Sequence, residues 1–171
     1  MTRPGGPSIL IGSVLLVCAM LAGPLVPAHA ADTYEPDDNP ALARAIVPDG
    51  ATQTHEIQPS SDQDYLRFSV NAGTEYIIET FPTTTNPVGD TVVTLYDSNG
   101  VTVISEDDDG GDGLYSRLQY AAPTSGTRYV RVRSYGGEHS GGYIVSVSTT
   151  SSAVLGGTIT VSYTHLRAHE T

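Results

Sequence analysis

The 171-residue sequence contains no lysine and no tryptophan, and it has a single cysteine. All eight basic side chains are arginines, set against 19 acidic side chains, which gives a formal net charge of -11. An acidic chain without lysine is a poor partner for phosphate backbones, so the composition argues against nucleic-acid binding. The one cysteine, Cys18, excludes a disulfide within the chain and a cysteine-based zinc or redox centre. The length fits one domain of ordinary size.

Residues 1–30 have the pattern of a secretion signal. Arg3 supplies a positive charge, an apolar stretch follows over residues 9–26, and the Ala-His-Ala sequence at 28–30 has the small residues of a cleavage site. Glycines and a proline interrupt the apolar stretch, which favours a cleaved signal over a spanning helix. A lipoprotein interpretation would use Cys18, but a bulky valine precedes it. We therefore expect a secreted protein with no membrane span after cleavage.

The other end of the chain contains a foreign-looking segment. Residues 161–171 read VSYTHLRAHET and follow a polar linker over residues 151–160. The whole segment matches one translated reading frame of a widely used transposase sequencing adapter. We therefore expect it to be an adapter-derived artefact, and the chain to be the N-terminal fragment of a longer protein. Its histidines and arginine are given no chemical role.

Residues 31–150 alternate apolar and polar side chains in short segments separated by turn residues. In residues 65–70, Leu66, Phe68 and Val70 share one face, as in a half-buried strand. Segments of this kind span residues 65–70, 75–81, 91–96, 101–105, 118–121, 129–133 and 143–147. The pattern predicts an all-β fold, an antiparallel β-sandwich of the jelly-roll or immunoglobulin-like type with about seven or eight strands. Only residues 40–45 suggest a helical turn.

Three clusters of carboxylates occur in this domain, in residues 34–39, 61–65 and 106–112. Closely spaced carboxylates repel one another unless a cation or solvent screens them. Calcium is a suitable cation, because it takes six to eight hard oxygen ligands and tolerates irregular geometry. The first two clusters flank one strand region, so they are able to converge on a single ion. The alternative is that each cluster is a solvated turn.

Six segments carry a resemblance to a known family. In chain order they are YEPDDNPALARAI, SDQDYLRFSVNAGTEYIIET, DTVVTLYDSNG, EDDDGG, YVRVRSYGG and GGYIVSV. Their order and content resemble the bacterial pre-peptidase C-terminal domain, and the resemblance covers residues 33–148. It implies a secreted bacterial β-sandwich that accompanies proteases.

The resemblance also implies a calcium site. Similar domains, the collagen-binding domains of clostridial collagenases, hold calcium near their N-terminal linker with an acidic segment and the aspartates that precede an Asp-Tyr strand. Carried over by residue, the implied ligands are Glu35, Asp37, Asp38, Asp62 and Asp64. Thr33 departs from the collagenase pattern, which has its first glutamate there. The loss of this carboxylate should weaken binding of the ion, or leave Asp32 or a water to fill the gap.

Two further sites are candidates. The candidate ligands of a second ion are Asp90, Asp107, Asp108 and Asp109. The alternative for this loop is an exposed, solubilising turn. A candidate ligand face for an extracellular polymer consists of Tyr129, Arg131, Tyr135 and Tyr143. Tyrosine and arginine are common at interfaces, but tyrosines also cover a core while their hydroxyls stay wet.

No catalytic site is expected in the domain. Its histidines are His55 and His139, and it has neither a GxSxG nucleophile elbow nor a His-x-x-x-His metal pair. We predict a non-catalytic, secreted accessory domain, stabilised by calcium and covalently linked to a peptidase or other hydrolase. The alternatives are a polymer-binding module, for collagen-like protein or polysaccharide, and a repeat of an envelope or adhesion protein.

Overall fold

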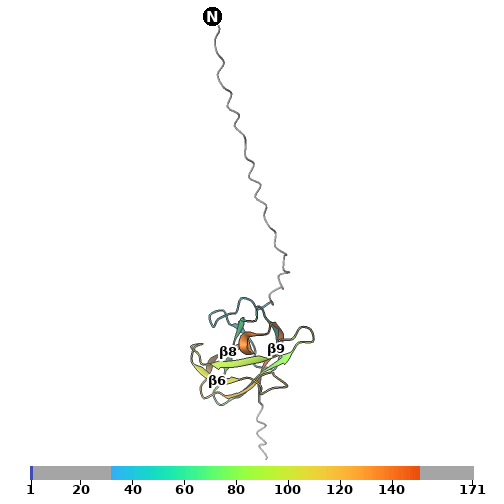
Figure 1. Ribbon diagram of the computed structural model, residues 1–171. Coiled ribbons are helices and arrows are strands. Elements are labelled where there is room, and N and C mark those ends of the chain that lie inside the picture. The colour runs from blue at the N-terminus through green and yellow to red at the C-terminus, as the bar shows by residue number, and fades with distance from the viewer. Residues whose placement is uncertain (2–31, 151–171) are drawn as a thin grey trace, which may run out of the picture.

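The computed structural model describes Met1 and residues 32–150, and the second range folds as two packed β-sheets (Figure 1). The expected signal peptide, the linker and the adapter-like segment lie outside the described residues. Within the described part of the chain, no helix has the length and apolar character needed to cross a membrane.

Nine strands form the two sheets of this domain. In chain order they are β1 (Arg44–Ala45), β2 (Thr52–Ile57), β3 (Gln63–Val70), β4 (Glu75–Pro82), β5 (Thr91–Tyr96), β6 (Val103–Asp107), β7 (Arg117–Ala121), β8 (Gly126–Ser134) and β9 (Gly141–Thr149). One sheet has the order β1-β3-β8-β5-β6 and the other the order β2-β9-β4-β7. The short β1 pairs with β3 in parallel, and the other paired strands are antiparallel. The expected β-sandwich is confirmed.

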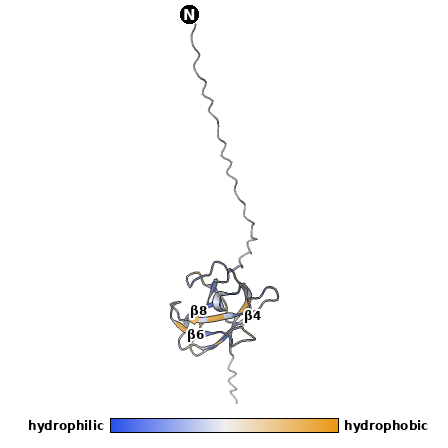
Figure 2. Ribbon diagram, viewed as in Figure 1, coloured by the Kyte–Doolittle hydropathy of each residue, from blue (hydrophilic) through white to orange (hydrophobic). Residues whose placement is uncertain are grey.

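The core lies between the two sheets and follows the alternation of the sequence. On β3, Leu66, Phe68 and Val70 are buried, while Arg67 and Ser69 between them are exposed. The hydrophobic segments lie on the strands of the sandwich, where Figure 2 colours them orange. Burial of the alternate side chains supplies the main driving force for joining the two sheets. The largest buried side chains from both sheets include Ile57, Leu66, Tyr76, Ile78, Leu95 and Tyr143.

Strand β5 differs from its expected half-buried pattern, because all six of its residues are buried. It lies between β8 and β6, so its outer face is covered by side chains from neighbouring strands. Arg131 of β8 lies over the ring of Tyr96, 5.7 Å from its centroid, and donates a hydrogen bond to Thr94 Oγ1. The ring of Tyr65 lies 6.1 Å from that of Tyr96. Polar side chains therefore cover this face without exposing the strand.

Two local predictions were incomplete or wrong. The helical turn expected over residues 40–45 is a single turn, in which Leu42 N donates to Asn39 O, followed by β1. Strand β2 was not predicted, because its sequence, TQTHEI, has one aliphatic side chain and gives little hydrophobic signal. Its register against β9 places His55 opposite Tyr143. This register brings β2 into the candidate metal centre.

Candidate metal centre

Three of the five predicted calcium ligands lie together at one end of the sandwich. Glu35 and Asp37 come from the segment that precedes β1, and Asp64 comes from β3. One carboxylate oxygen from each of these side chains lies within 4.8 Å of the other two. The structure therefore brings the first two acidic clusters of the sequence into one group.

Hydrogen bonds hold the N-terminal segment against the sandwich and so fix this group. Tyr65 N donates to Asp37 O at 2.9 Å, which attaches the segment to β3. Arg44 donates from Nη2 to Glu35 O at 2.8 Å and from Nε to Tyr34 O. Within the segment, Asp37 N donates to Glu35 Oε2 at 3.2 Å. The loop carrying two of the carboxylates is thus positioned by backbone contacts, not by the carboxylates alone.

Asp64 is a carboxylate placed deep in the domain, with 1% of its surface exposed. Its Oδ2 accepts a hydrogen bond of 2.6 Å from the hydroxyl of Tyr143, whereas its Oδ1 has no hydrogen-bond partner among the described residues. Burial raises the pKa of Asp64 to about 9, although the Tyr143 hydrogen bond lowers it, because a charged carboxylate loses its hydration there. Burial and the Asp64 charge raise the pKa of Tyr143 as well.

Asp37 has a similar environment and is also 1% exposed. Its Oδ2 lacks a hydrogen-bond partner within residues 32–150. Burial, followed by the negative charges of Glu35 and Asp32, raises the pKa of Asp37 to about 7, against the opposing effect of Arg44. The pKa of Glu35 is raised too, mainly by burial and by the charge of Asp62. Without a cation, the site therefore favours the protonated, neutral form of these carboxyl groups, because hydration does not offset their charge.

The other two predicted ligands have different surroundings. Asp62 is buried, but its Oδ2 accepts from Gln58 N at 3.0 Å and its Oδ1 from Gln63 N at 2.8 Å. Both oxygens thus already serve the turn that leads into β3. Asp38 is exposed to solvent. These two carboxylates contribute charge near the group, and they do not belong to its set of converging oxygens.

The structure adds two residues that the ligand prediction did not include as primary ligands. Asp32 and His55 join Asp64 in a second group whose ligand atoms also lie within 4.8 Å of one another. His55 is 1% exposed, and its Nδ1 lies 3.7 Å from both Asp32 Oδ2 and Asp37 Oδ2. Burial lowers the pKa of His55 to about 4. The available signal was the alternation of His55 and Ile57 with polar residues on β2.

The third acidic cluster forms a loop between β6 and β7 that is more open to water. Asp90, Asp108 and Asp109 have oxygens within 4.8 Å of one another, but none of the three side chains is fully buried. Asp107 lies apart from this group, and its Oδ2 accepts from Gly110 N at 3.0 Å and Arg117 N at 2.7 Å. Asp107 therefore stabilises the loop, and the second ion site stays a prediction.

The predicted tyrosine face is incomplete. Tyr143 is fully buried and directs its hydroxyl to Asp64, so it does not belong to an exposed surface. Tyr135 is 54% exposed in the short 3₁₀ turn η1 (Tyr135–Gly137). Tyr129 and Arg131 are partly buried on β8, where they lie on the outer face of the five-stranded sheet. Sequence alternation did not separate the buried Tyr143 from the other tyrosines of the predicted face. Tyr143 lies on β9, which belongs to the four-stranded sheet, whereas Tyr129 lies on β8 of the five-stranded sheet.

The geometry of the two overlapping groups suits a divalent cation. Asp64 belongs to both groups, and the unpartnered atoms Asp37 Oδ2, Asp64 Oδ1 and His55 Nδ1 lie among them. Buried polar atoms normally have hydrogen-bond partners, so several unpartnered acceptors in one place call for an explanation. A cation provides one, since it pairs with every acceptor at once.

Comparison with known proteins relates part of the domain to a family. Residues 62–134 match the family described as bacterial pre-peptidase C-terminal domain. The matched range contains Asp64, whereas Glu35 and Asp37 precede it. A comparison with curated proteins finds no match.

Solved structures share the sandwich. The pre-peptidase C-terminal domain of collagenase from Bacillus anthracis is 18% identical with a TM-score of 0.50, and the alignment covers 62% of this chain and 94% of that one. PliG of Aeromonas hydrophila, a periplasmic inhibitor of g-type lysozyme, is 14% identical over 63% and 96% of the chains, with a TM-score of 0.45. CorA of Methylomicrobium album BG8, a surface-associated copper-binding protein, is 11% identical over 62% and 98%, with a TM-score of 0.47. At 18% identity, the likeness to the collagenase domain establishes the fold alone.

Proposed function

We propose that this β-sandwich, which matches the family described as bacterial pre-peptidase C-terminal domain over residues 62–134, is a non-catalytic, secreted accessory module stabilised by calcium. Glu35, Asp37 and Asp64 are the proposed ligands. The observation that carries the proposal is their convergence from two separate segments, in which Asp37 and Asp64 each have a buried oxygen without a hydrogen-bond partner among the described residues.

The donor set fits calcium. All three ligands are carboxylates, which are the hard oxygen donors that calcium prefers, and calcium accepts irregular arrangements more readily than magnesium does. A double positive charge would offset the burial and the neighbouring negative charges that raise the pKa of Asp37 and Asp64. Three side chains supply part of a coordination shell of six to eight oxygens, so water or backbone oxygens would complete it.

The bound ion would fix the N-terminal segment on the sandwich. Glu35 and Asp37 lie on this segment, while Asp64 lies on β3, so one ion would connect them directly. Extracellular calcium modules have dissociation constants on the order of 0.1 to 1 mM. At about 1 mM free calcium, binding then adds roughly 0.4 to 1.4 kcal/mol to the free energy of unfolding. That is enough to shift a weakly held segment toward its docked state.

We further propose that this module accompanies a peptidase or other hydrolase domain outside the cytoplasm. The support is the family, together with the apolar segment of the sequence that ends in Ala-His-Ala at residues 28–30. Export is tested by expressing the chain in a bacterial host and sequencing the N-terminus of the secreted product. Cleavage after Ala30 is expected, and retention of an uncleaved chain in the cytoplasm would contradict export.

Calcium binding is tested by the melting temperature of the protein in excess calcium and in chelator. We expect calcium to raise it in the native sequence and to have no effect in Glu35→Gln and Asp64→Asn. Asp112→Asn is the matched control, because Asp112 is an exposed acidic residue outside both groups of converging ligands. An equal melting temperature with and without calcium in the native sequence would overturn the proposal.

A further inference from the structure

His55 is a buried imidazole held in one orientation by its surroundings. Its ring is stacked between two tyrosines, 4.2 Å from the centroid of Tyr34 and 5.7 Å from that of Tyr143, with interplanar angles of 17° and 20°. On the strand, it lies opposite Tyr143 in the β2–β9 pairing. The position of its two nitrogens is therefore set by packing before any ligand arrives.

Hydrogen bonds fix which nitrogen of His55 carries the proton. The amide of Gln53 donates from Nε2 to Ala45 O at 2.9 Å, which directs its Oε1 toward His55. His55 Nε2 lies 3.2 Å from that oxygen, which only accepts, so Nε2 carries the hydrogen. A neutral ring with a protonated Nε2 has a free lone pair on Nδ1.

This lone pair points into the group of acidic side chains. His55 Nδ1 has no hydrogen-bond partner in residues 32–150, and it lies 3.7 Å from Asp32 Oδ2 and Asp37 Oδ2. That distance is too long for a hydrogen bond. Acceptor atoms that face one another in a buried site repel unless a cation lies between them. The arrangement of the acceptors is that of ligands around a metal ion.

We propose that His55 Nδ1, with the carboxylates of Asp32 and Asp64, binds a divalent d-block cation such as Zn²⁺. Imidazole nitrogen is a preferred ligand of these metals, whereas calcium and magnesium select oxygen. One ligand atom from each of the three residues lies within 4.8 Å of the others. The proposal depends on the calcium site only through Asp64, which belongs to both ligand groups.

Outer contacts in the structure match those of known metal ligands. Metal-binding histidines commonly donate their second N–H to an oxygen, and His55 does so to Gln53. Asp32 accepts from Tyr34 N through Oδ1 and from Glu56 N through Oδ2, both at 2.7 Å. These bonds orient the carboxylate and leave lone pairs on each oxygen for a cation. The proposed ligands are thus preorganised.

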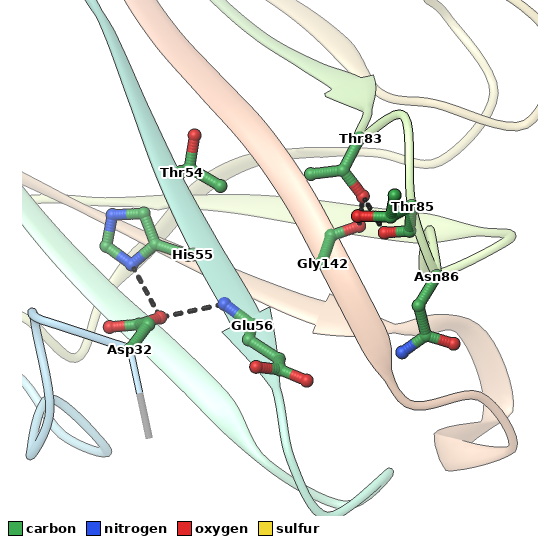
Figure 3. A pocket seen from close by; sticks show the side chains of 8 residues that line it. All are labelled: Asp32, Thr54, His55, Glu56, Thr83, Thr85, Asn86 and Gly142. Atoms are coloured by element: carbon green, nitrogen blue, oxygen red, sulfur yellow. Dashed lines mark hydrogen bonds and ion pairs between the residues drawn. The ribbon is translucent and has the colours of Figure 1, made fainter. Parts of the chain in front are cut away.

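A pocket borders this side of the group, where the Asp32 side chain is partly exposed. It has a volume of about 240 Å³, and its lining includes Asp32, His55, Thr54 and Thr83. Figure 3 shows Asp32 and His55 side by side on one wall, with the contact between Asp32 and His55 drawn as a dashed line. The acidic lining also attracts cations.

The test is a Zn²⁺ titration by calorimetry on the calcium-free protein, with Co²⁺ absorption as a second readout. The background carries His165→Ala and His169→Ala, because that pair has the spacing of a metal-binding motif. We expect one high-affinity Zn²⁺ per chain. His55→Gln, which lacks Nδ1, and Asp32→Asn should each weaken binding by about 10-fold or more. His139→Gln is the matched histidine control and should bind Zn²⁺ as the background does.

The calcium and zinc responses separate the two proposals. Glu35→Gln should lose the calcium response and keep Zn²⁺ binding, whereas His55→Gln should do the reverse. Asp64→Asn should lose both. Unfolding curves establish that each variant is folded. If His55→Gln does not fold, Asp32→Asn is used to test the Zn²⁺ site instead. Absence of Zn²⁺ binding, or equal affinity in folded His55→Gln and Asp32→Asn, would overturn the d-block site whatever calcium does.

Discussion

Two acidic regions of this domain look alike in sequence and differ in structure. At the N-terminal group, Asp37 and Asp64 are each 1% exposed, and each has an oxygen without a hydrogen-bond partner within residues 32–150. In the β6–β7 loop, Asp109 is exposed, and Asp107 accepts two backbone hydrogen bonds. The number of carboxylates is similar in both regions. Burial and hydrogen bonding therefore distinguish the candidate metal centre from a loop that backbone hydrogen bonds to Asp107 stabilise.

The difference also explains why unpartnered atoms have unequal weight in the two regions. Asp90 and Asp108 each have one oxygen without a partner among the described residues, but both side chains remain partly open to solvent. Their pKa values are raised, first by desolvation and then by neighbouring aspartates. Water reaches the exposed Asp109 of this loop and screens its charge, whereas Asp37 and Asp64 are each 1% exposed.

The largest expected effect comes from removing the one donor that Asp64 has. Tyr143→Phe deletes the 2.6 Å hydrogen bond to Asp64 Oδ2 and leaves a buried carboxyl group without a partner. We expect the free energy of unfolding in chelator to fall by roughly 2 kcal/mol. Tyr135→Phe, at an exposed tyrosine, should change it by less than about 0.5 kcal/mol. If denaturant unfolding gave the same loss of stability for Tyr143→Phe and Tyr135→Phe, the hydrogen bond to Asp64 would not stabilise the fold.

A second substitution tests whether Asp107 stabilises the β6–β7 loop. A Cβ at Gly110 would lie 2.5 Å from Asp107 Oδ1 and 2.9 Å from Arg117 O, so Gly110→Ala must displace the carboxylate or the backbone. We expect a loss of about 1 to 2 kcal/mol. Gly89→Ala, where a Cβ meets no atom within 4 Å, is the matched control. The loss should be the same in calcium and in chelator, and a calcium-dependent loss would assign Asp107 to an ion site.

The free energy of unfolding, measured over a range of pH without divalent cations, tests the buried carboxyl groups of the N-terminal group. The folded pKa of Asp64 is raised to about 9, so between pH 4 and 9 the native state retains a proton that the unfolded chain releases. The stability from this group is complete below pH 4 and is lost as the pH rises through 9. Asp37 contributes in the same direction up to about pH 7, and His55 opposes both between about pH 4 and 6.5.

The clean window is therefore pH 7 to 9, where Asp64 dominates these three groups. We expect the free energy of unfolding in chelator to fall by on the order of 1 kcal/mol per pH unit there. Asp64→Asn should remove this slope, and saturating calcium should reduce it. Denaturant unfolding at pH 7, 8 and 9 measures the change. A rise in stability over this window in chelator would contradict a protonated Asp64.

The smallest effect on stability is expected at an exposed aspartate of the β6–β7 loop. Asp109→Asn should change the free energy of unfolding by less than about 0.5 kcal/mol, because its side chain is exposed to water. The calcium-dependent rise in melting temperature should remain as in the native sequence. Differential scanning fluorimetry with and without calcium is sufficient. Loss of the calcium response in this variant would move the main ion site to the β6–β7 loop.

Much of the fold was predictable from the sequence, because alternation reports burial directly where one face is wet. Leu66, Phe68 and Val70 on β3 are the clearest case. Strand β2 gives only a weak signal, since one of its two buried positions is the polar His55 and the other is Ile57. For β5, the alternation wrongly predicted an exposed outer face. The side chains that cover this face come from β8 and β3, which are distant in sequence.

The candidate metal centre was predictable in part. Glu35, Asp37 and Asp64 followed from the family resemblance, which places motifs but not side-chain surroundings. The role of Asp62 in its turn and the position of His55 depend on backbone hydrogen bonds and on the β2–β9 register. Neither is encoded by local spacing. Tyr143 likewise needed the structure, because its hydroxyl reaches across to β3 from the other sheet.

The arrangement of β9 has a mechanical consequence. This strand begins near the metal centre, where Tyr143 pairs with His55, and it ends beside Thr150, whose N donates to Glu75 O. Asp32 lies next to His55, so a pull applied between Asp32 and Thr150 runs along β9. Its hydrogen bonds to β2 and β4 on either side are then loaded in shear, the direction in which many must break together. The same pull also loads the contacts between the N-terminal segment and β3, such as Tyr65 N to Asp37 O, and a cation bound there would raise the force needed to detach the segment.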